Sequence, residues 1–99
     1  IAATGPCICR DCFEVDADLG EKFQNEFGYP GISRPGRPGK AYVDLELAAA
    51  VQFVEAGIRP ESITLMNACT YENRRHFFSH RRDKGITGSM AAYIKLIKP

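Results

Sequence analysis

Two stretches of helical periodicity, each followed by a glycine, constrain the fold of this 99-residue chain more than any other feature. The first spans residues 16–27 and precedes Gly28; the second spans residues 41–56 and precedes Gly57. Their apolar stripes consist of Leu19, Phe23 and Phe27 in the first stretch and of Leu47, Val51 and Val54 in the second. Because spacings of three and four residues put side chains on one helical face, the pattern predicts two helices that each pack against an apolar surface.

The ends of both helices carry recognisable signals. Asp16 or Asp18 is predicted to cap the first helix and Asp44 the second, since an aspartate at that place accepts hydrogen bonds from the free N–H groups of the first turn. Gly28 and Gly57 supply the left-handed backbone on which helices commonly end. If the second helix ends in a Schellman motif, Ile58 is expected to contact Phe53.

Short apolar or alternating runs surround the helices and read as strands. They are the end of a strand within residues 1–8, a short extension at 12–15, a strand at 62–69, and further strands at 77–79 and 90–96. Residues 29–40 contain three prolines and three glycines and are predicted to be a loop. The order indicates an α+β fold, with a mixed sheet and helices packed on one of its faces.

Charge and composition exclude several classes of function. The formal net charge is +1, so charge alone favours neither nucleic acid nor an acidic membrane as a partner. No apolar run is long enough to span a bilayer, and no signal-peptide pattern is visible. We therefore expect a cytoplasmic protein. The chain begins with Ile1 rather than Met, which suggests a piece of a longer protein.

Sulfur and imidazole side chains invite a metal-site interpretation. The candidates are Cys7, Cys9, Cys12 and Cys69 together with His76 and His80. Zinc favours sulfur and nitrogen ligands, but no second C-x-x-C pair accompanies the first cysteine cluster, so reduced, buried thiols are favoured over a zinc site. A thiolate–imidazole pair between Cys69 and one histidine is a weaker alternative.

Cations and aromatic residues gather in segment 74–84, and just beyond it lies a Thr-Gly turn. A nucleic-acid surface is disfavoured, because the positive charge is confined to this one segment. The segment suits a single bound anion such as phosphate better, since guanidinium groups bind phosphate bidentately and glycine lets the backbone approach closely. The candidate residues are Ser79, Arg81, Arg82, Asp83, Thr87 and Gly88. The alternative is an arginine paired with Asp83 or Glu72 at the surface.

These motifs, taken together, resemble the laccase-domain family. The stretches that carry the resemblance are Cys69-Thr70, Phe77-Phe78-Ser79-x-Arg81-Arg82-Asp83, Thr87-Gly88, Gly5-Pro6-Cys7-Ile8, Phe13-Glu14-Val15 and Tyr42-Val43-Asp44-Leu45. Members were once described as multicopper polyphenol oxidases and are now regarded as zinc-dependent purine nucleoside phosphorylases with adenosine deaminase side activity. The family pattern usually ends Thr-Gly-Arg, whereas here Ser89 follows Gly88.

The resemblance implies that residues 1–99 are the C-terminal part of a single domain, half of a larger α/β sandwich. The family's zinc (or copper) ligands would then lie in the preceding half, so no metal ligand and no catalytic residue is assigned to this chain, which alone would be inactive. Purine nucleoside and phosphate are the implied substrates, with Ser79, Arg81, Arg82 and Thr87 as contacts and Asp83 orienting an arginine. The missing half, or a second copy of the chain, is the expected partner.

Two other functions remain open from the sequence. One is a non-catalytic binding or structural module that uses the basic segment 74–84 as its interaction surface. The other is a zinc-finger-like module, which stoichiometric zinc in the purified chain would support.

Overall fold

A computed structural model of the chain describes residues 1–73 and 75–97. The elements, in chain order, are β1 (Ala2–Ala3), β2 (Glu14–Asp16), α1 (Ala17–Phe27), β3 (Ser33–Pro35), β4 (Lys40–Val43), α2 (Leu45–Glu55), a 3₁₀ turn (Pro60–Ser62) and β5 (Ile63–Thr64). Strands β2, β4 and β3 form an antiparallel sheet in that order, and β1 pairs in parallel with β5. The predicted mixed α and β architecture with two helices is therefore confirmed.

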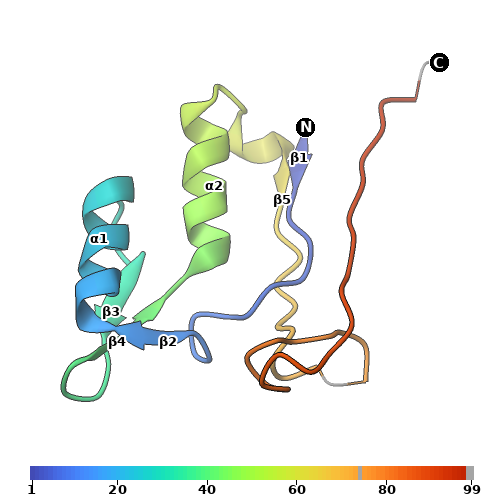
Figure 1. The fold of residues 1–99 in the computed structure, drawn as a ribbon. Helices are drawn as coiled ribbons and strands as arrows, with labels where there is room; N and C mark the ends of the chain where they lie inside the picture. Colours follow the sequence, from blue (N-terminus) through green and yellow to red (C-terminus); the bar gives the residue numbers. More distant parts are fainter. Residues whose placement is uncertain (74, 98–99) are drawn as a thin grey trace.

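Helix α1 packs on the antiparallel sheet, as Figure 1 shows. The core beneath it consists of the buried residues Val15, Ala41 and Val43, with Phe13, Phe23 and Leu45 packed against them. Gly20 lies directly against the sheet, because a Cβ at this position would stand only 2.6 Å from the Cβ of Ala41. The core is small, and the absence of a side chain at Gly20 allows α1 to pack closely on it.

The caps follow the sequence at three of the four helix ends. Gly28 adopts the left-handed conformation after α1, with φ of 65°. Asp44 caps α2, since its Oδ1 accepts a hydrogen bond from the N–H of Leu47 at 3.0 Å. Beyond α2, Gly57 has φ of 97°, and the N–H of Ile58 donates to the carbonyl of Phe53 at 3.0 Å. This is the expected Schellman bond.

The fourth helix end departs from expectation. Asp16 occupies the N-cap position of α1 but makes no capping hydrogen bond with its side chain. Its carboxylate pairs instead with the ammonium group of Lys40 at 2.7 Å. These two residues lie opposite one another in the pairing of β2 with β4, so the cross-strand ion pair takes the place of the cap.

The prediction that residues 29–40 form a loop is wrong for its second part. Strand β3 and the first residue of β4 lie in this segment, joined by a turn in which Gly39 has φ of 80°. Pro35 is compatible with a strand because β3 is at the edge of the sheet, where a missing N–H breaks no ladder. Density of proline and glycine was therefore a poor guide to this hairpin.

Two predicted strands are absent from the described residues. Residues 77–79 are an irregular stretch between two turns, and residues 90–96 form an extended segment without strand pairing. Tyr93 and Leu96 in that segment are 97% and 84% exposed. Alternation of apolar residues favours a strand, but a strand also needs a neighbour for its backbone groups, and no described segment pairs with this one. The predicted strand at 62–69 shrinks to β5 and one bridge between Cys7 and Cys69.

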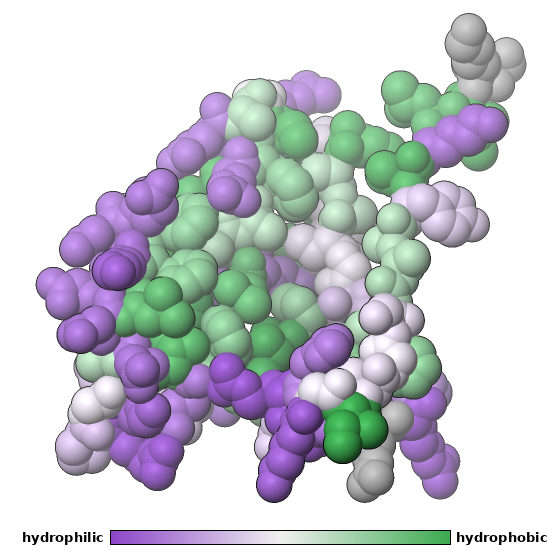
Figure 2. Space-filling model, in the orientation of Figure 1, coloured by the Kyte–Doolittle hydropathy of each residue, from purple (hydrophilic) through white to green (hydrophobic). Residues whose placement is uncertain are grey.

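The molecule is thin, with principal extents of 53, 33 and 15 Å. Figure 2 shows apolar residues in the middle of one face, over the helices, and again along the C-terminal segment. An apolar groove of about 680 Å³ lies between that segment and β1, lined also by Phe53 and Ile58. Among the described residues, no helix has the length and apolar character needed to cross a membrane.

Candidate functional sites

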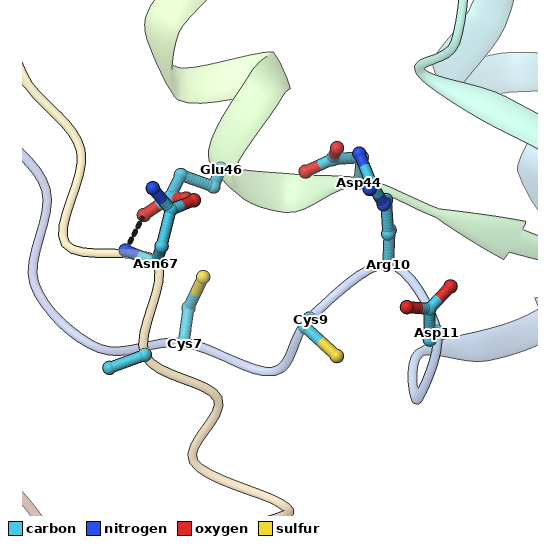
Figure 3. A pocket seen from close by; sticks show the side chains of 8 residues that line it. Cys7, Cys9, Arg10, Asp11, Asp44, Glu46 and Asn67 are labelled. Carbon is cyan, nitrogen blue, oxygen red and sulfur yellow. Dashed lines mark hydrogen bonds between the residues drawn. The ribbon is translucent and has the colours of Figure 1, made fainter.

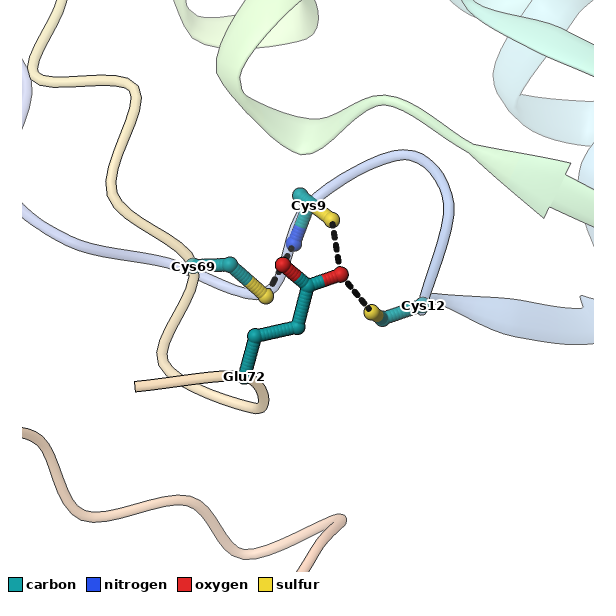
Figure 4. Close-up of side chains that lie close together, drawn as sticks. All are labelled: Cys9, Cys12, Cys69 and Glu72. Carbon is teal, nitrogen blue, oxygen red and sulfur yellow. Dashed lines mark hydrogen bonds between the residues drawn. The ribbon is translucent and has the colours of Figure 1, made fainter. Parts of the chain in front are cut away.

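Four potential metal ligands from two distant segments meet at one place. Cys9 and Cys12 lie on the turn that precedes β2, and Cys69 and Glu72 lie on a turn after β5. One ligand atom of each of the four residues lies within 4.8 Å of all the others. Figure 4 shows the Glu72 carboxylate between the sulfur atoms, with the Cys12 thiol donating to Glu72 Oε1 at 3.1 Å and the Cys9 thiol at 3.9 Å.

Backbone hydrogen bonds hold the two segments side by side. The N–H of Cys7 donates to the carbonyl of Ala68, and the N–H of Thr70 donates to the carbonyl of Cys7, both at 3.1 Å. This pattern continues the parallel pairing of β1 with β5 by one bridge. Each segment then turns back on itself: the N–H of Cys12 donates to the carbonyl of Cys9, and the N–H of Asn73 to that of Cys69. The ligand cluster thus sits where the short parallel sheet ends.

The sulfur atoms of the cluster lie in different electrostatic surroundings. Burial acts to raise the pKa of Cys69, but hydrogen bonds from the backbone N–H groups of Cys9, Glu72 and Tyr71 favour the thiolate, and the pKa ends below its ordinary value. The pKa values of Cys9 and Cys12 are raised, mainly because burial disfavours their thiolates. The Glu72 carboxylate adds to this effect at Cys12.

Cys7 faces a polar pocket of about 230 Å³, which Cys9 also lines. Figure 3 shows Cys7 with Glu46 and Asn67 on one side of this pocket and Arg10 and Asp44 on the other. Glu46 Oε2 accepts hydrogen bonds from the hydroxyl of Thr4 at 2.7 Å and from the N–H of Asn67 at 3.2 Å. Burial and then the carboxylates of Glu46 and Asp44 raise the pKa of Cys7, so this thiol stays protonated.

Arg82 is the centre of hydrogen bonding in the segment that carries the predicted anion site. Its guanidinium donates to the carbonyls of Thr70 at 2.8 Å and Phe77 at 2.9 Å, and forms a bidentate pair with Asp83 at 3.1 and 3.0 Å. A weaker contact reaches the carbonyl of Tyr71 at 3.4 Å. Arg82 therefore joins three parts of an irregular segment, and Asp83 is one of the two arginine partners that the sequence offered, the other being Glu72.

A second pocket, of about 560 Å³, lies beside this arginine. Arg82, Asp83, Thr87 and Gly88 all line it, together with Arg75, His76, Phe77, Phe78 and Ile86. The Oγ1 atom of Thr87 is buried and has no hydrogen-bond partner among the described residues. Gly88 lies against the ring of Phe78, where a Cβ would be only 2.8 Å from the ring. This pocket brings together four of the six predicted anion-site residues.

The other predicted residues lie elsewhere. Arg81 donates to the carbonyl of Glu14 at 2.8 Å and stands over the ring of Phe13, with 5.3 Å between the guanidinium carbon and the ring centroid. Ser79 is buried, and its Oγ accepts a hydrogen bond from the N–H of Arg82 at 3.2 Å. Ser79 thus supports the turn that carries Arg82.

The histidines stay apart from the cysteine cluster. His76 lines the second pocket and contacts the ring of Phe77 edge-on, and within the described part of the chain neither His76 nor His80 is among the grouped metal ligands. Arg74, the first residue of the predicted basic segment, lies outside the described residues. The metal interpretation built on cysteines and histidines is replaced by a grouping of three cysteines and Glu72.

The sequence analysis did not identify Glu72 as a potential metal ligand, although its spacing from Cys69 was a signal. Cys69-Thr-Tyr-Glu72 repeats the spacing of Cys9-Arg-Asp-Cys12, with a carboxylate in place of the second thiol. A search restricted to pairs of cysteines does not find such a pair.

Comparison with known proteins agrees with this fold. The profile of a family described as "Multi-copper polyphenol oxidoreductase laccase" matches residues 1–97, and the chain belongs to this family. Metal binding is in keeping with that description, and the cysteine–glutamate cluster is a possible metal site.

Individual members of this family show which named enzymes the chain is similar to. The chain is 36% identical over 95 residues to "Purine nucleoside phosphorylase YlmD" from Geobacillus stearothermophilus, covering 93% of this chain and 34% of that protein. It is 39% identical over 83 residues to "Adenosine deaminase RL5" from an unknown prokaryotic organism, covering 82% of this chain and 32% of that protein. The crystal structure of YlmD matches with a TM-score of 0.77 at 34% identity, over 87% of this chain and 33% of that one. The chain therefore spans about a third of the length of these relatives.

Proposed function

We propose that this chain is the C-terminal part of a purine nucleoside phosphorylase and that it supplies one wall of the substrate pocket. The observation that carries this proposal is the family membership, together with the similarity to a relative named as such a phosphorylase. Because the chain spans about a third of that relative, the activity belongs to the complete protein, with the remaining part on the same polypeptide or on a partner.

The second pocket is the part of this chain best suited to the role. The buried hydroxyl of Thr87 has no hydrogen-bond partner among the described residues, and a bound phosphate or ribose oxygen would satisfy it. Arg82 keeps this wall in shape through its carbonyl contacts, while Asp83 fixes the guanidinium plane. Of the other proposed contacts, Ser79 supports the wall through its hydrogen bond from the N–H of Arg82, whereas Arg81 lies outside the pocket on the carbonyl of Glu14.

In the proposed phosphorolysis, one bond forms and one bond breaks. An oxygen of phosphate forms a bond to the anomeric carbon of the ribose, the bond from that carbon to the purine nitrogen breaks, and the base leaves with a proton. Positive charge and hydroxyl donors on the pocket wall hold the anionic nucleophile in place. The zinc that the resemblance implies has its ligands outside this chain, so no step is assigned to it here.

The test is base release from inosine, guanosine and adenosine by the complete protein, with and without phosphate. Phosphate-dependent release, with ribose 1-phosphate as the second product, is expected. Release that is independent of phosphate, or no turnover of any nucleoside by the folded protein, would refute the proposal.

Adenosine deamination is a second candidate activity, favoured by the similarity to a relative named adenosine deaminase. Ammonia formation from adenosine measures it separately, because phosphorolysis releases adenine and no ammonia.

A further inference from the structure

The cysteine–glutamate cluster consists of two C-x-x-ligand turns that face each other. Cys9 and Cys12 project from one turn, Cys69 and Glu72 from the other, and about sixty residues of chain separate the two turns. Paired turns with this spacing are how structural zinc sites assemble four ligands from two short segments, because each turn delivers two ligands at little cost in entropy.

The distances suit a zinc ion. With Zn–S bonds of about 2.3 Å, the ligand atoms of a tetrahedral site lie about 3.8 Å apart. The four ligand atoms of the cluster are within 4.8 Å of one another, and the Glu72 oxygen is 3.9 Å from the Cys9 sulfur. The separations in the cluster therefore exceed the tetrahedral value by no more than about 1 Å.

Hydrogen bonds from neighbouring groups hold Cys69 and the turn that carries it, as they commonly do around metal ligands. The N–H of Cys9 donates to the Cys69 sulfur at 3.3 Å, which favours a thiolate there. Arg82 holds the carbonyls of Thr70 and Tyr71, the two residues between Cys69 and Glu72, so the second turn is fixed from behind. Such contacts orient ligands and raise metal affinity.

The cluster also concentrates groups that become negative together. A carboxylate and three thiolates cannot all be charged side by side without a cation. A divalent ion replaces the three thiol protons, which pass to solvent, and removes this repulsion.

We propose that Cys9, Cys12, Cys69 and Glu72 bind one Zn²⁺ ion in a closed, structural site that fastens the turn before β2 to the turn after β5. Three sulfur ligands favour zinc over magnesium or calcium, and four protein ligands leave no open position for substrate. None of the four ligands lines the pocket proposed for the nucleoside, so the zinc proposal can be tested independently of the proposed function.

The test is metal content and cobalt spectroscopy of the protein, purified under reducing conditions and reconstituted with Zn²⁺ or Co²⁺. The wild type is expected to hold one equivalent that depends on this cluster, and the Co²⁺ form to show a thiolate charge-transfer band. Cys12→Ser should lose the equivalent, and Glu72→Gln should weaken Zn²⁺ binding by at least about tenfold. Glu72 is exposed, so this variant is expected to keep its fold.

Cys7→Ser is the matched control, because Cys7 is the one remaining cysteine and is not among the four grouped ligands. It should retain both the equivalent and the cobalt band. Equal metal loss in Cys7→Ser and Cys12→Ser would overturn the proposal. Equal metal content in the reconstituted wild type and in Cys12→Ser would also overturn the proposal.

Discussion

Replacing Thr87 by valine should make the protein more stable and weaken phosphate binding in the pocket that we propose for the substrate. Valine has nearly the shape of threonine, so the change removes the hydroxyl and little else. In the unliganded protein this hydroxyl is buried without a partner among the described residues. An unsatisfied buried polar group costs about 1–3 kcal/mol, and because the Thr87 side chain as a whole is only half-buried, we take the lower end.

The two effects have separate magnitudes. A gain of about 1 kcal/mol raises the melting temperature of the complete protein, whose relatives are about three times as long as this chain, by about 2 °C. The loss of a hydrogen bond to a charged ligand costs about 1.5–3 kcal/mol, which is about a 10- to 150-fold rise in Kd for phosphate.

Thermal unfolding followed by circular dichroism and phosphate titration by calorimetry, both on the complete protein, measure the two effects. Thr64→Val is the control, because Thr64 is exposed on β5 and lies outside the pocket; its stability should change by no more than about 0.5 kcal/mol. A Thr87→Val variant that is destabilised, or that binds phosphate as tightly as the wild type, would refute the reasoning.

Three further predictions concern the scaffold. Gly20→Ala should destabilise the fold by about 1–2 kcal/mol in urea unfolding, because overpacking against Ala41 exceeds the gain of about 1 kcal/mol in helix propensity; an unchanged or higher midpoint would contradict this. Arg37 lowers the pKa of Glu14 from its ordinary value of 4.5, so their pairing stabilises the protein above that pH and is lost as the pH falls through the lowered pKa. Glu14→Gln should flatten the loss of stability in acid below about pH 4.5, and an acid transition identical to that of the wild type would argue against the pair. The 99-residue chain alone should associate through residues 90–97, whose large apolar side chains are exposed; sedimentation of a monomer at all concentrations would count against this.

The sequence was most informative where structure depends on near neighbours. Gly28, Asp44 and the Gly57–Ile58 end of α2 follow from residues within one helical turn, and all three predictions are confirmed. Asp16 shows the limit of this reasoning, because Lys40 competes for its carboxylate from the paired strand and local rules do not include that partner.

The candidate sites show the same limit. The sequence gathered Arg82, Asp83, Thr87 and Gly88 because they are neighbours along the chain, and the structure places them around one pocket. Glu72 could not be paired with Cys9 and Cys12 in the same way, because only the continuation of the β1–β5 pairing brings the two turns together.

The contacts of Arg82 determine how the segment around it unfolds locally. The described residues between Thr70 and Gly88 form no helix or strand, so the contacts of the Arg82 guanidinium join turns that are otherwise held by local backbone hydrogen bonds. Loss of the Arg82 contacts would release the carbonyls of Thr70 and Phe77 at the same time. Amide hydrogen exchange should therefore show the protected N–H groups of Asp83 and Ile86 exchanging in step, as a single cooperative unit rather than residue by residue.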